Sequence, residues 1–136
     1  MSTRISVVLL AIAAVSMPVM AQTGGQVASP AHSRDETVAL GYMRTVLYAQ
    51  KDYKKRHGQY ATSLAALVHS VSFTKRMANP DRGAYTVQFH GKPEAYSLAL
   101  VPKQFDADHR AFFVDETGKV RVEEDKPAAV ESPLLK

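Results

Sequence analysis

Two carboxylates stand close together in the stretch FDADH, residues 105–109. Oxygen-rich loops suit calcium, which takes about six to eight oxygen ligands from carboxylates, carbonyls and water. Asp106 and Asp108 alone are too few for such a site. A solvated turn between two strands explains the same residues, so the sequence favours the turn and leaves calcium binding as the alternative.

Common catalytic motifs are missing from the sequence. It contains neither H-E-x-x-H nor G-x-S-x-G, and no glycine-rich loop that could cradle phosphate. The histidines are scattered, at positions 32, 57, 69, 90 and 109. The sequence therefore predicts a protein that is not an enzyme and has no catalytic, cofactor-binding or metal-binding residues. A small hydrolase is the least favoured alternative.

The stretch AQKDYKKRHGQYATSLAAL, residues 49–67, is rich in basic side chains. Residues 54–57 are all basic or histidine and suit the last turn of a helix, where cations face the negative end of the helix dipole. Gly58 suits the left-handed residue that ends such a helix. No aromatic–basic alternation of the kind that stacks on bases accompanies the cluster. With a net charge of only +4, we expect a solvated helix end and no nucleic-acid partner.

Residues 1–21 have the pattern of a secretory signal peptide. Arg4 precedes an apolar run, and Val19 and Ala21 occupy the positions that a signal peptidase reads. We expect cleavage after Ala21, a periplasmic or secreted bacterial protein, and no stable membrane span afterwards. A retained membrane anchor is the alternative, against which Pro18 argues. The sequence has no cysteine, which excludes disulfides and a lipid on an N-terminal cysteine.

A flexible linker is expected over residues 22–32, QTGGQVASPAH, and a long helix from Arg34 to His57. Ser33 with Glu36 forms the pattern of a capping box at its start. Residues at three- and four-residue steps share one apolar face: Ala39, Met43, Val46, Leu47, Gln50 and Tyr53. Because Gln50 lies on this face, we expect it to bind a backbone group in a loop or strand.

Beyond the helix the apolar period changes to two. The segments AYTVQFH, AYSLALV, RAFFV and KVRV alternate like strands, and Gly118 suits the turn between the last two. The predicted fold class is α+β: one long N-terminal helix packed on an antiparallel β-meander of about four strands. We place the domain at residues 33–122. The tail, residues 123–136, is polar and proline-containing and is expected to be disordered.

Residues 39–67, ALGYMRTVLYAQKDYKKRHGQYATSLAAL, resemble the start of the globular domain of bacterial type IV pilin-like proteins and pseudopilins. The later segments YSLALVP and HRAFFVDETGKVR are similar to the sheet of that group, so the resemblance covers about residues 36–122. It implies a pilin-like fold and a non-enzymatic structural or interaction module. The implied partner is another envelope or secretion-system protein, in a type IV pilus or a type II secretion system.

The N-terminal segment departs from the pilin pattern. Pilin precursors carry a glycine directly before a phenylalanine and a glutamate four residues after it. Residues 1–34 contain no Gly-Phe pair and no acidic residue. The resemblance therefore does not extend to filament assembly. The alternative is a periplasmic ligand-binding or inhibitory domain on the same scaffold, with no link to pili.

Overall fold

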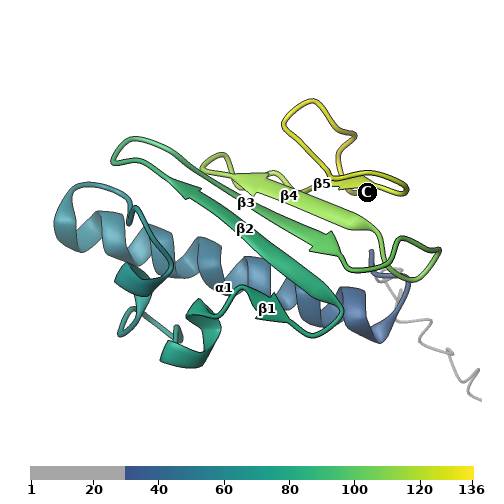
Figure 1. The fold of residues 1–136 in the computed structure, drawn as a ribbon. Helices are drawn as coiled ribbons and strands as arrows, with labels where there is room; N and C mark the ends of the chain where they lie inside the picture. Colours follow the sequence, from purple (N-terminus) through teal and green to yellow (C-terminus); the bar gives the residue numbers. More distant parts are fainter. Residues whose placement is uncertain (1–29) are drawn as a thin grey trace, which may run out of the picture.

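The computed structural model describes residues 30–136 and shows a long helix lying across one face of an antiparallel sheet (Figure 1). The signal peptide expected at residues 1–21 and most of the expected linker lie outside the described residues. In the part that the structure describes, no helix is long and apolar enough to cross a membrane.

Helix α1 (Arg34–His57) has the bounds that the sequence predicts. At its start the Ser33 Oγ accepts a hydrogen bond of 3.1 Å from the Glu36 N–H. At its end Gly58 has a left-handed φ of 75° and its N–H donates to the Lys54 carbonyl at 2.8 Å. The predicted N-cap serine and C-cap glycine are thus both confirmed. The buried face differs from the predicted stripe: Leu47 and Tyr53 are only partly buried, while the face also contains Glu36, Leu40, Tyr42 and Ala49.

The sheet is a meander in the order β1-β2-β3-β4-β5. Its strands are β1 (Asp81–Arg82), β2 (Tyr85–Gly91), β3 (Tyr96–Pro102), β4 (Ala111–Asp115) and β5 (Arg121–Glu123). The α+β class is confirmed, but the sheet has five strands and not about four. The extra strand is β1, which lies in the stretch NPDRG and pairs back on β2. A strand of two residues is too short for alternation to show it.

The core lies between α1 and the inner face of the sheet. Leu98 and Leu100 of β3 stand opposite Val114 and Phe112 of β4, and all four are fully buried. On the helix, Met43 and Val46 are buried against the same cluster. The alternation predicted for β2 and β3 therefore directs their apolar side chains to the helix, as expected for a sheet with one covered face.

Between α1 and the sheet the chain forms two short 3₁₀ turns, η1 (Ala65–Leu67) and η2 (Lys75–Ala78). At η1 the Ser63 Oγ accepts from the Ala66 N–H at 3.2 Å. Leu67 is fully buried. This turn docks the segment on α1.

The expectation of a disordered tail, residues 123–136, is wrong. The Val122 N–H donates to the Pro133 carbonyl and the Leu135 N–H to the Val120 carbonyl, both at 2.9 Å. The Arg121 guanidinium also donates to the Ser132 carbonyl at 2.7 Å. Composition suggested a loose segment, but the free backbone groups beside β5 and the burial of Ala128 hold the tail in place.

Candidate functional site

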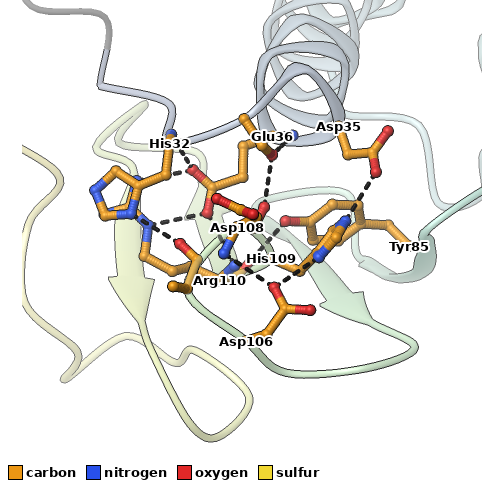
Figure 2. A network of polar contacts seen from close by, with 10 residues as sticks. His32, Asp35, Glu36, Tyr85, Asp106, Asp108, His109 and Arg110 are labelled. Atoms are coloured by element: carbon orange, nitrogen blue, oxygen red, sulfur yellow. Dashed lines mark hydrogen bonds and ion pairs between the residues drawn. The ribbon is translucent and has the colours of Figure 1, made fainter.

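A buried ion pair joins the first turn of α1 to the start of β4 (Figure 2). The Arg110 Nε and Nη2 each lie 3.0 Å from one carboxylate oxygen of Glu36. The same carboxylate accepts from the Arg110 N–H at 2.9 Å and from the His32 N–H at 2.6 Å. The Glu36 side chain is fully buried. Four hydrogen bonds thus satisfy one buried charge.

This arrangement modifies the predicted capping box. The Ser33 hydroxyl accepts from the Glu36 N–H, as the motif requires. In a complete capping box the Glu36 carboxylate would accept from the Ser33 N–H. Here it accepts from the His32 N–H and from Arg110. Burial alone would raise the pKa of Glu36. The hydrogen bonds from Arg110 and His32 outweigh that effect and hold the pKa below its ordinary value of 4.5. Glu36 is therefore an anion held in place by its neighbours.

His109 lies beside this pair, between two carboxylates (Figure 2). Its Nε2 is 2.8 Å from Asp35 of α1, and its Nδ1 is 2.7 Å from Asp106 of the β3–β4 loop. Only the imidazolium can donate to both oxygens at once. The hydrogen bonds to Asp35 and Asp106 raise the pKa of His109, and the bond from His109 lowers the pKa of Asp106.

The FDADH stretch takes part in this network. Asp106 accepts from the Asp108 N–H at 2.9 Å, while the Asp108 carbonyl accepts from the Ser33 hydroxyl at 2.5 Å. Asp106 thus forms hydrogen bonds within its turn and with His109. Within residues 30–136 no group of three or more His, Cys, Asp or Glu side chains is placed to hold a metal ion.

The chemistry of this cluster is that of a joint between two segments. Tyr85 donates its hydroxyl to the Arg110 carbonyl at 2.8 Å, and burial raises the pKa of the phenol. In the described part of the chain, every buried side-chain nitrogen and oxygen has a hydrogen-bond partner. Each charged side chain of the cluster has an oppositely charged partner, and these contacts fix the helix start to the β3–β4 loop. Sequence reasoning missed this joint, since no local motif links residues 74 positions apart.

Gln50 performs the role that the sequence predicted. Its Nε2 donates to the Ala61 carbonyl at 2.9 Å, and its Oε1 accepts from the Ala61 N–H at 2.8 Å. Both residues are fully buried. The Gln50 side chain thus satisfies both backbone groups of Ala61, as a neighbouring strand would, and it holds the loop after α1 against the helix.

A groove of about 1020 Å³ follows the C-terminal half of α1. Its rim carries Lys51, Lys54 and Lys55 from the helix, and the β4–β5 turn contributes Glu116. The apolar part of its lining consists of Leu47, Tyr48, Tyr60, Val71 and Tyr96. The Lys54 Nζ lies 4.3 Å from the centre of the Tyr60 ring. The groove thus combines positive charge with aromatic and aliphatic surface.

The sequence located the lysines of this groove but missed their surroundings. Lys54 and Lys55 do occupy the last turn of α1. Tyr48 and Val71 are nevertheless 62% and 57% exposed, unusually open positions for large apolar side chains. The available signal was Tyr48 itself, an aromatic residue off the apolar stripe of the predicted helix.

Comparison with known protein families, with curated proteins and with solved structures finds no match to this chain in any of the three.

Proposed function

We propose that this chain is an exported, non-enzymatic, pilin-like structural or interaction module. Its partner is another envelope or secretion-system protein, in a type IV pilus or a type II secretion system. The signal-peptide pattern of residues 1–21 and the resemblance over residues 36–122 support this proposal. So does the packing of one long helix on an antiparallel meander.

The groove beside α1 is the observation that carries the interaction role. Tyr48 and Val71 leave apolar surface open to solvent, and Tyr60 and Tyr96 lie in the same groove. Tyrosine is enriched at protein interfaces because it offers apolar area and a polar tip. The charged cluster of Glu36, His109 and Arg110, by contrast, is occupied with internal contacts.

The second candidate is a periplasmic ligand-binding or inhibitory domain without any pilus link. The size of the groove favours it, since about 1020 Å³ lies at the upper limit of ordinary small-molecule pockets, roughly 300–1,000 Å³. A small ligand would fill such a groove and leave no covalent protein adduct in the experiment below.

Photo-crosslinking in a bacterial host that exports the full chain tests the first proposal. A photoreactive residue replaces Tyr48 in the groove or, as the matched control, exposed Gln88 on the uncovered face of β2. We expect a discrete protein adduct from position 48 and none from position 88. N-terminal sequencing of the exported protein should begin at Gln22. Equal labelling at both positions, or no adduct at either, would reject the groove as the interaction surface.

A further inference from the structure

We propose that the groove beside α1 binds the acidic C-terminal segment of a second copy of this chain. The acidic segment is defined here as residues 123–131, EEDKPAAVE. This inference rests on the proposed function and names the partner of its surface. A second copy is itself an exported protein of the same compartment, so the two proposals are compatible.

The groove carries unbalanced positive charge. Among residues 30–136, neither Lys51 nor Lys55 forms an ion pair. Asp52, which also lines the groove, is bound to Arg56 at 2.8 Å. Glu116 is the acidic residue on the opposite rim. The lysines therefore offer a site for carboxylates from another molecule.

The acidic segment has the complementary character. Four of its nine residues are acidic and one, Lys126, is basic. Within the described chain, none of the acids forms an ion pair. Val130 in this segment is 57% exposed, and Leu134 shortly after it is 47% exposed. Both surfaces thus pair one sign of charge with open apolar side chains, which is the composition expected of two faces that dock on each other.

The geometry requires two copies. Backbone hydrogen bonds from Val122 to Pro133 and from Leu135 to Val120 hold the tail beside β5. Figure 1 shows the tail projecting from β5 on the side of the sheet away from α1. The segment could reach the groove of its own chain only by breaking those bonds. Because the groove and the tail are different surfaces, each contact joins the groove of one copy to the tail of another.

Charge reversal tests this contact in protein purified from cells that express the full chain. The groove variant carries Lys51→Glu and Lys55→Glu, and the tail variant carries Glu124→Lys and Asp125→Lys. The control carries Arg34→Glu and Lys75→Glu, which makes the same charge change as the groove variant at exposed positions outside the groove. Circular dichroism melts establish that all three fold. Sedimentation velocity over a concentration series measures association.

We expect wild type and control to associate at low salt and to weaken by about tenfold or more as salt rises from roughly 0.05 to 0.5 M. Each reversed variant alone should be monomeric, and mixing the two should restore association because opposite charges face each other again. The chain lacks cysteine, so Tyr48→Cys and Val130→Cys in separate chains give a second measurement. A disulfide-linked dimer should form in their mixture and from neither alone.

Several results would overturn the inference. If the wild-type protein stays monomeric up to about 1 mM, the groove does not bind a second copy. The same conclusion follows if neither charge reversal affects association. If the purified protein is monomeric but Tyr48 crosslinks to a protein of another mass in cells, the proposed function stands and the self-contact falls. If position 48 yields no adduct and the protein is monomeric, both fall.

Discussion

The carboxylate of Glu36 and the guanidinium of Arg110 meet through two contacts of 3.0 Å, although 74 positions separate them in the chain. Both side chains are buried. Their contact fixes the first turn of α1 to the start of β4. Removing one partner leaves the other as an uncompensated charge in the interior.

Glu36→Ala and Arg110→Ala should therefore each lower the free energy of unfolding by about 3–5 kcal/mol. The exposed pair Asp81–Lys103 has a similar distance of 2.8 Å, yet Lys103→Ala should cost only about 0–1 kcal/mol. Urea denaturation measures all three. The double variant Glu36→Leu with Arg110→Met should lose less than the two single changes combined. Equal costs for the buried and the exposed pair would contradict this account.

His109 should make stability depend on pH. The hydrogen bonds to Asp35 and Asp106 raise the pKa of His109 in the folded protein. The contribution of His109 to the free energy of unfolding is therefore complete below the ordinary pKa of about 6.5, and it disappears as pH rises through the raised pKa. The pKa of Asp106 is lowered, so the contribution of Asp106 to the free energy of unfolding disappears only as pH falls below about 3.8. The contact is thus complete between roughly pH 4 and 6.5. Buried Glu36 and Arg110 are also close by, but they neutralise each other.

The measurement is the melting temperature of wild type and of His109→Gln from about pH 5 to pH 9. The difference between them should shrink as pH rises. His90→Gln, on an exposed position of β2, serves as the control and should follow wild type. Parallel curves for wild type and His109→Gln would show that the contact does not titrate.

Gln50→Leu should cost about 2–4 kcal/mol, because it leaves the buried N–H and carbonyl of Ala61 without partners. Gln59→Leu changes the same residue type at an exposed position and should alter stability by less than about 0.5 kcal/mol. Hydrogen exchange of the Ala61 amide would report the lost bond directly. Unchanged protection at Ala61 in Gln50→Leu would contradict the role assigned to this side chain.

Two glycines on α1 should respond to alanine in opposite directions. Gly41 is inside the helix and Gly58 ends it with a φ of 75°, and an added Cβ meets no atom within 4 Å at either position. Gly41→Ala should therefore stabilise by roughly 0.5–1 kcal/mol through helix propensity. Gly58→Ala should destabilise by about 1 kcal/mol, because alanine resists the left-handed conformation. Thermal melts of the two variants provide the comparison, and shifts of the same sign would disprove it.

Features encoded within a few neighbouring residues were predictable from the sequence. The bounds of α1, the cap at Gly58 and the alternation of β2 and β3 follow from local patterns. The backbone role of Gln50 could also be inferred, since a polar group on an apolar face must find a partner.

Features that depend on distant residues were not predictable in this way. Nothing near Glu36 indicates that its partner is Arg110, and nothing in FDADH indicates that Asp106 shares a histidine with Asp35. The pairing of the tail with β5 was hidden for a similar reason. Its composition suggested a loose segment, while its order comes from backbone groups that composition does not describe.

The position of residues 133–135 beside β5 has a consequence for solubility. An unpaired strand edge can template the addition of strands from other molecules and so begin a fibril. Here the backbone of the last residues occupies that edge, and the strand at the opposite end of the sheet, β1, is only two residues long. The final residues of this chain thus cover the β5 edge, and a truncation that removes them would expose a strand edge prone to aggregation.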